Sequence, residues 1–171
     1  MKALKIIGAM VLLLAIVYFI LPSTAHVERS IVIDAQPDAV FAHMNGMNKF
    51  HEWSPWASLD PDMKVTFEGA EEGVGSKMSW ESEVQEVGSG SQWIVESIPN
   101  KFVKNHLTFG PDADPTEAAF TLIPQDGGTK VTWTFDAKDM SGGDKIFAAF
   151  ADKMLGPQYE QGLSNLKKLV E

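Results

Sequence analysis

The sequence predicts an α+β fold in which a curved antiparallel sheet of six to seven strands surrounds a long C-terminal helix. Three observations carry this prediction. A strand-like segment and two short helical segments open the globular part, short alternating runs separated by turn residues follow, and a long segment with helical periodicity closes the sequence. With 171 residues, 44% of them hydrophobic, the chain is long enough for one domain with a buried core.

Residues 1–25 form a segment ahead of the predicted domain, residues 26–171. Lys2 and Lys5 precede an apolar run at residues 6–21, which would extend about 24 Å as an α-helix. Such a run is typical of a membrane-spanning helix. We expect a single-pass anchor in the inner membrane of a bacterium, with the domain in the periplasm. The alternative is a signal peptide cleaved near Ala25, which would release the domain into the periplasm.

The predicted domain begins with one strand and two short helices. Apolar residues alternate in HVERSIVIDA, residues 26–35, which predicts a strand. A short helix is predicted for QPDAVFAHMNG, because Pro37 lies near its first turn and Gly46 can end it. MNKFHEW, residues 47–53, predicts a second short helix.

Turn residues separate six strand-like runs in the middle of the sequence. The Asp-Gly-Gly step at residues 126–128 is a strong hairpin signal between two alternating runs. In the run after it, Val131, Trp133 and Phe135 share one face, as expected for an antiparallel strand with one solvated face. The six runs are KVTFEG, GSKMSWESEV, SGSQWIVESIP, KFVKNHLTFG, TEAAFTLIPQ and TKVTWTFDAK.

A helical pattern at residues 144–170 closes the sequence. Gly156 and Pro157 interrupt it, so we expect a kink or a brief break there. A curved antiparallel sheet needs its concave face covered, and this helix is the available cover. Its apolar stripe consists of Ile146, Phe147, Phe150, Met154, Leu155, Tyr159, Leu163, Leu166 and Val170.

Composition excludes several classes of function. The net charge of −9 disfavours binding to the phosphate backbone of nucleic acids. The absence of cysteine from the sequence excludes disulfides, a thiol nucleophile and a cysteine-based zinc site. The four histidines show no metal-ligand spacing on a single predicted element, so we expect no metal and no required cofactor.

Five segments carry a family resemblance, in this order: FHEWSPWASLDP, GVGSKMSW, VGSGSQWIVESIPN, GGTKVTWTF and DKMLGPQYEQGLSNLKKL. Through them, residues 26–171 resemble the polyketide cyclase/dehydrase, START-like (SRPBCC) superfamily. The resemblance implies a helix-grip fold, and many bacterial members also carry an N-terminal apolar helix. Members include lipid-transfer domains, hormone receptors, aromatase/cyclases and co-chaperone activators, so the resemblance leaves the activity open.

Two polar residues in the run KFVKNHLTFG are candidates for chemistry. Asn105 and His106 lie on opposite faces of the predicted strand. If Val103 and Leu107 face inward, Asn105 is the buried polar group and His106 is solvated, which is the interpretation we favour. In the other register, His106 could act in a cavity as a general acid or base.

Aromatic and methionine side chains predict the lining of an apolar pocket between sheet and helix, although a filled core without a cavity fits the same pattern. The segment HEWSPWASLDP is interpreted as a stiff corner whose tryptophans close the mouth of the pocket, and we expect opening between this corner and the C-terminal helix. The predicted lining and mouth residues are Trp53, Trp56, Met78, Trp80, Trp93, Asn105, Leu107, Trp133, Phe147, Phe150 and Met154.

These observations favour a binding module for a lipid or another hydrophobic small molecule, attached to the membrane through residues 6–21. Two alternatives stay open. One is an enzyme similar to the polyketide cyclases and dehydratases, with Asn105 or His106 as its polar group. The other is a co-chaperone-like domain that binds a partner protein near the membrane.

Overall fold

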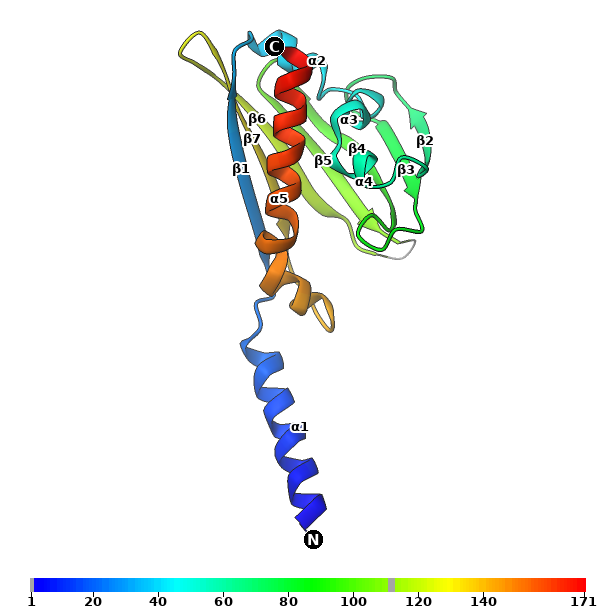
Figure 1. The fold of residues 1–171 in the computed structure, drawn as a ribbon, viewed down its shortest axis with the longest axis vertical. Coiled ribbons are helices and arrows are strands. Elements are labelled where there is room, and N and C mark those ends of the chain that lie inside the picture. The colour runs from blue at the N-terminus through cyan, green and yellow to red at the C-terminus, as the bar shows by residue number, and fades with distance from the viewer. Residues whose placement is uncertain (1, 111–112) are drawn as a thin grey trace.

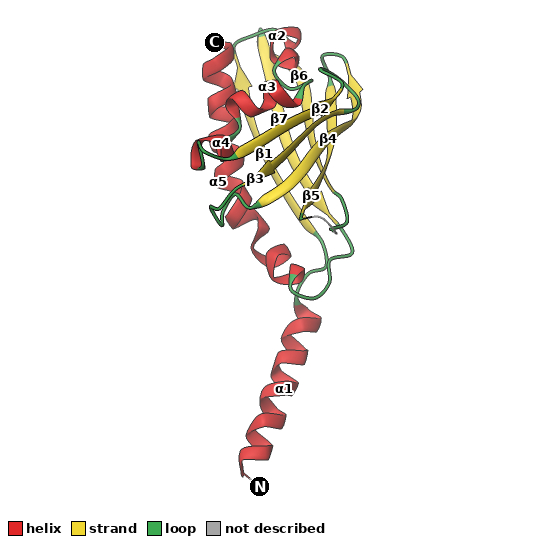
Figure 2. Ribbon diagram, turned by 90° about the vertical axis from the view of Figure 1, so that its right-hand side faces the viewer, coloured by secondary structure: helices red, strands yellow, loops and turns green. Residues whose placement is uncertain are grey.

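The computed structural model describes residues 2–110 and 113–171. A seven-stranded antiparallel sheet forms the body of the domain, in the order β1-β7-β6-β5-β4-β3-β2 (Figure 1). The helices α2 to α5 lie on one side of this curved sheet (Figure 2). The α+β architecture with a long C-terminal helix over the sheet is therefore confirmed.

The elements agree with the predicted order, with one addition. A third short helix, α4, forms within the segment that we interpreted as a corner, because Pro55 at its first position has the backbone angle that a helix needs. The elements are α1 Lys2–Ile20, β1 Ala25–Ile33, α2 Pro37–Ala42, α3 Met47–Trp53, α4 Pro55–Leu59, β2 Lys64–Gly69, β3 Ser76–Glu81, β4 Ser89–Ile98, β5 Phe102–Phe109, β6 Thr116–Gln125, β7 Gly128–Ala137 and α5 Asp144–Val170.

Alternation along the strands sorts the side chains between two faces of the sheet. On the central strands the concave face is buried, as in β7, where Val131, Trp133 and Phe135 are all nearly inaccessible to solvent. The register pairs Phe120 of β6 with Trp133 of β7, and Val27 of β1 with Phe135. Because the strand period is two residues, this register places every second side chain of these strands toward α5.

An aromatic cluster fills the space between the central strands and the helices. Trp133 stacks on Tyr159 of α5 with ring centroids 3.9 Å apart, and it meets the edges of Phe50 and Trp53 from α3. Gly162 makes this packing possible, since a Cβ atom there would lie 2.7 Å from the Trp133 ring. The interior next to Trp133 is therefore a filled core.

The two halves of α5 differ in how many of their side chains are buried. Tyr159, Leu163 and Leu166 of the second half are almost fully buried, whereas in the first half only Ala151 is. The helix does not break at Gly156 and Pro157 but continues through them, and its axis bends in the part nearest α1 (Figures 1 and 2). The second half thus carries most of the packing of α5 onto the domain.

Helix α1 projects away from the sheet, so that the two termini lie at opposite ends of the molecule (Figure 1). It contacts the start of α5 through Tyr18, whose backbone oxygen accepts a hydrogen bond of 2.8 Å from Lys145 Nζ. The ammonium of Lys145 also lies 4.6 Å from the centre of the Tyr18 ring. Across the residues that the structure describes, no helix combines the length and the apolar character that a membrane crossing requires.

Candidate functional site

An apolar groove runs along the first half of α5. Its volume is about 570 Å³, and its lining consists of Gly143, Ile146, Phe147, Phe150, Lys153 and Met154. Ile146, Phe150 and Met154 are 57%, 53% and 56% exposed, so the groove presents apolar surface to solvent. Lys153 supplies the one charge in this lining. An exposed apolar surface with few polar groups suits contact with an apolar ligand.

Phe147 connects the groove to the concave face of the sheet. Its ring meets the edge of Phe135 on β7, with centroids 6.0 Å apart. Ala148 and Leu155, on the same half of α5, also pack against the core, although each is only partly buried. The first half of α5 therefore separates the groove from the buried floor of the sheet.

That floor contains a polar group without a partner. Asn105 of β5 has no exposed surface, and neither amide atom of its side chain forms a hydrogen bond within the described part of the chain. Its neighbours across the strands are Ile94 of β4 and Ala118 of β6. Burying an amide without a partner costs about 1–3 kcal/mol. Asn105 therefore lowers the stability of the domain relative to an apolar residue of the same size at this position.

The register confirms that Asn105 is the inward residue and that His106 is not. His106 lies on the opposite face, about one third exposed, with Nε2 3.7 Å from Glu117 Oε1. Its ring meets the edge of Trp93, with centroids 5.7 Å apart. General acid or base chemistry by His106 inside a pocket is therefore excluded by its position.

Trp93 shares this outer face, so its predicted place in the pocket lining is wrong. Its neighbours Gln92 and Ile94 are the buried residues of β4, and alternation then directs Trp93 away from α5. The prediction was wrong because it placed the more hydrophobic residue, Trp93, on the inward face. The inward position next to Trp93 is occupied by a polar residue, Gln92.

Trp53 is also misplaced in the prediction, since it lies in the core and not at a mouth. It is 1% exposed, and its indole Nε1 donates a hydrogen bond of 2.8 Å to the backbone oxygen of His43. Trp56 is partly buried and meets the edges of Trp133 and Tyr159. An opening between this corner and α5 would disrupt the aromatic cluster, so the structure does not favour the predicted entrance.

The remaining predicted residues divide into two groups. Phe147, Phe150 and Met154 come together in the groove on α5. The others lie on the concave face of the sheet: Met78 and Trp80 on β3, Leu107 beside Asn105 on β5, and Trp133 on β7. Trp80 is only partly buried, and its indole Nε1 donates to the backbone oxygen of Val87.

Three features of this region were missed by sequence reasoning. Ile146 was recognised as part of the helical stripe but not as a pocket residue, although its spacing from Phe150 is the signal for a shared face. Tyr159 stacks on Trp133, and burial raises the pKa of its phenol, with a smaller contribution from Asp136, so the hydroxyl stays protonated. The third feature is the ion-pair cluster around Arg29, for which the sequence holds no local signal.

The same region offers little to a metal ion. Among residues 2–110 and 113–171, no group of three histidine or acidic side chains is arranged to hold one. What the arrangement can do chemically is bury apolar surface and offer two buried amides, those of Asn105 and Gln92, on the concave face of the sheet.

Solved structures with the same fold are similar to this chain at low sequence identity. The Aha1 dimer from Colwellia psychrerythraea is 18% identical, with a TM-score of 0.60, and the match covers 86% of this chain and 96% of that one. The Zhui aromatase/cyclase from Streptomyces sp. R1128 is 14% identical, with a TM-score of 0.61, and the match covers 86% and 93% of the two chains. No curated protein matches the sequence.

The family is shown by a sequence profile that covers most of the chain. Residues 24–171 match the profile described as polyketide cyclase/dehydrase and lipid transport. This span contains the whole sheet and α5, together with the groove and its polar floor. The chain therefore belongs to the polyketide cyclase/dehydrase and lipid transport family.

Proposed function

We propose that the domain binds a lipid chain or another hydrophobic small molecule, and that the ligand enters at the groove on the first half of α5. The observation that carries the proposal is the groove itself, about 570 Å³ in volume, with three half-exposed apolar side chains in its lining. All of the lining comes from α5 and the residue before it, so the groove is shallow and would cover one side of a ligand. Covering such side chains stabilises a complex by about 25 cal/mol per Å² of apolar surface.

The family supports the same reading, because its description includes lipid transport. The packing of the domain adds a second support. The first half of α5 is thinly packed, and its aromatic contact with the sheet is that of Phe147 with Phe135 on β7. Asn105 lies two strands away in the same row, because Phe135 pairs with Ala118 of β6 and Ala118 pairs with Asn105 of β5. A ligand that displaced Phe147 would reach Phe135 on the concave face and leave the stack of Trp133 on Tyr159 in place.

Asn105 favours one alternative, an enzyme similar to the aromatase/cyclases. A buried amide on the floor of an apolar site could orient or polarise a carbonyl group of a bound polyketone. A change of Asn105 to Leu distinguishes the two functions. A binding module keeps its affinity for apolar molecules in this variant, whereas an enzyme of this kind loses turnover while it still binds its substrate.

Membrane attachment through residues 6–21 is a proposal from the sequence, and it would place the domain in the periplasm of a bacterium. The lysines at positions 2 and 5 support it, together with the exposure of Ile6, Ile7 and Phe19 on α1. Alkaline carbonate extraction of membranes carrying the full chain tests it. Release into the supernatant, or an N-terminus beginning near His26, would contradict the anchor.

Binding can be tested on the full chain in mild detergent with an apolar naphthylamine dye that fluoresces in apolar surroundings. Ile146→Ser removes apolar surface from the groove and should weaken dye binding about tenfold, which corresponds to about 1.4 kcal/mol. The matched control is Ile123→Ser, because Ile123 is similarly exposed, at 52%, but lies on the outer face of β6. Equal effects of the two substitutions, or no binding of the dye by the unmodified chain, would refute the proposal.

A further inference from the structure

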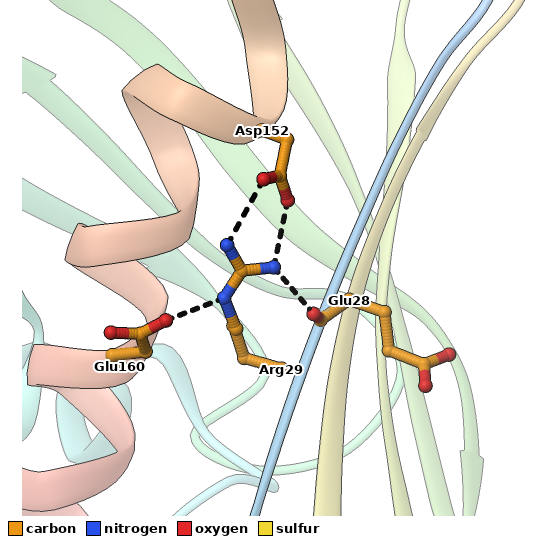
Figure 3. Close-up of polar contacts among 4 residues, drawn as sticks. All are labelled: Glu28, Arg29, Asp152 and Glu160. Atoms are coloured by element: carbon orange, nitrogen blue, oxygen red, sulfur yellow. Dashed lines mark hydrogen bonds and ion pairs between the residues drawn. The ribbon is translucent and has the colours of Figure 1, made fainter.

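Arg29 joins the edge strand β1 to both halves of α5 (Figure 3). Its guanidinium donates two hydrogen bonds to the carboxylate of Asp152, from Nη1 at 2.7 Å and from Nη2 at 3.2 Å. Nε donates a third, of 2.7 Å, to Glu160 Oε1, and Nη1 also donates to the backbone oxygen of Glu28 at 2.8 Å. Paired bonds of this kind fix the orientation of a guanidinium as well as its position.

The two carboxylates lie on opposite sides of the weakest point of α5. Asp152 precedes Gly156 and Pro157, and Glu160 follows them. Pro157 has no N–H with which to bond the carbonyl of the preceding turn, and Gly156 adds conformational freedom. Gly156 also makes room for the cluster, because a Cβ atom there would overlap Nη2 of Arg29. The same two residues therefore weaken the helix and admit the guanidinium.

The two halves of α5 depend on Arg29 to different degrees. The second half is held by the burial of Tyr159, Leu163 and Leu166. The first half buries only Ala151, and within the described chain its one ion pair to the sheet is the pair between Asp152 and Arg29. Loss of this pair would make the first half open more often, while loss of the pair to Glu160 would leave the second half held by its core packing.

We propose that Arg29 clamps the first half of α5 shut across a hinge at Gly156 and Pro157, and so controls the access of an apolar ligand to the concave face of the sheet. This proposal rests on the proposed function for its ligand, but the clamp itself is a property of the fold. In the closed state, Phe147 covers Phe135. When Asp152 leaves Arg29, residues 144–155 rotate about the hinge and uncover this contact, while Glu160 keeps Arg29 in place on the second half.

The pair of carboxylates provides a matched experiment, because Asp152 and Glu160 are exposed to the same degree, at 64% and 65% of their side chains. Asp152→Asn and Glu160→Gln each weaken one contact of Arg29 with little change in shape. We expect Asp152→Asn to speed the uptake of the naphthylamine dye roughly two- to fivefold in stopped-flow mixing, the range that one half-exposed ion pair supports. Glu160→Gln should leave the rate within experimental error of the unmodified chain.

Amide hydrogen exchange supplies a readout that needs no ligand. In Asp152→Asn, the amides of residues 144–155 should exchange faster by a similar factor, while those of residues 158–170 keep the exchange rates of the unmodified chain. In Glu160→Gln, both segments should keep those rates. Equal acceleration of both segments by the two substitutions, or no acceleration by Asp152→Asn, would overturn the clamp.

The two readouts separate this proposal from the proposed function. If the dye fails to bind and the exchange of residues 144–155 still responds only to Asp152→Asn, the clamp stands and the proposed function fails. If the dye binds and its uptake does not distinguish the two variants, the proposed function stands and the clamp fails.

Discussion

Replacing Asn105 by Leu should stabilise the domain, although it changes a fully buried residue at the centre of the sheet. Asn105 has no exposed surface, and both amide atoms of its side chain are without partners in the part of the chain that the structure describes. Leu has a similar size and branching, and it brings no polar atom into the core. The neighbouring Ile94 and Ala118 are apolar and suit it.

The magnitude follows from the cost of burying an amide without hydrogen bonds. That cost is about 1–3 kcal/mol, and Leu removes it while adding apolar burial. The free energy of unfolding should therefore rise by about 1–3 kcal/mol, less any strain from the altered shape. For a domain of this size, each kcal/mol corresponds to a rise in Tm of about 2–4 °C.

Urea denaturation of the unmodified chain and of the variant measures this difference. Thr129→Val is a matched control with the opposite sign, because Thr129 is equally buried but its hydroxyl donates a hydrogen bond of 2.7 Å to the backbone oxygen of Ala35. We expect the control to lose about 0.5–1.5 kcal/mol. If Asn105→Leu is destabilised as much as the control, the amide of Asn105 is hydrogen-bonded in solution and the reasoning fails.

Three further results are expected. Trp53→Ala should cost about 3–5 kcal/mol in urea denaturation, because Trp53 is a buried core residue, and a smaller loss would restore its predicted role at a mouth. Gly162→Ala should lose about 1–3 kcal/mol because its methyl group collides with Trp133, and an unchanged Tm would contradict this packing. The hydrogen bonds from Arg29 lower the pKa of Asp152 below 3.8. The ionised carboxylate of Asp152 therefore stabilises the fold fully above pH 3.8, and this stabilisation is lost as the pH falls through the lowered pKa. The difference in Tm between the unmodified chain and Asp152→Asn should accordingly vanish in acid.

Local patterns in the sequence were enough to predict the sheet, because each strand carries its own alternation and its own turns. The inward position of Asn105 followed from Val103 and Leu107 on either side of it. The same logic failed at β4, where Gln92 takes the inward position and Trp93 the outward one. In that strand the more hydrophobic residue faces outward and the polar one inward. Only the register with β5, which pairs Gln92 with Leu107, shows which of them faces the core.

The parts of the site that involve distant residues could not be predicted. Arg29 and Asp152 are separated by 123 positions in the sequence, and no local pattern around either residue indicates that they form an ion pair. The burial of Trp53 has the same origin. Its surroundings come from α3, β6, β7 and α5, and no local pattern specifies how those elements meet.

The energetic costs of opening at Trp53 and Trp56 and of opening under the first half of α5 support the route that we propose for a ligand. An entrance at Trp53 and Trp56 requires the aromatic cluster around Trp133 to separate, and burying one such side chain is worth several kcal/mol. An entrance under the first half of α5 requires the loss of one ion pair, of the burial of Ala151, and of contacts such as that of Phe147 with Phe135. A minor open state is populated to a useful extent only when it lies within a few kcal/mol of the closed one. We therefore expect opening in the half of α5 that Arg29 holds through Asp152.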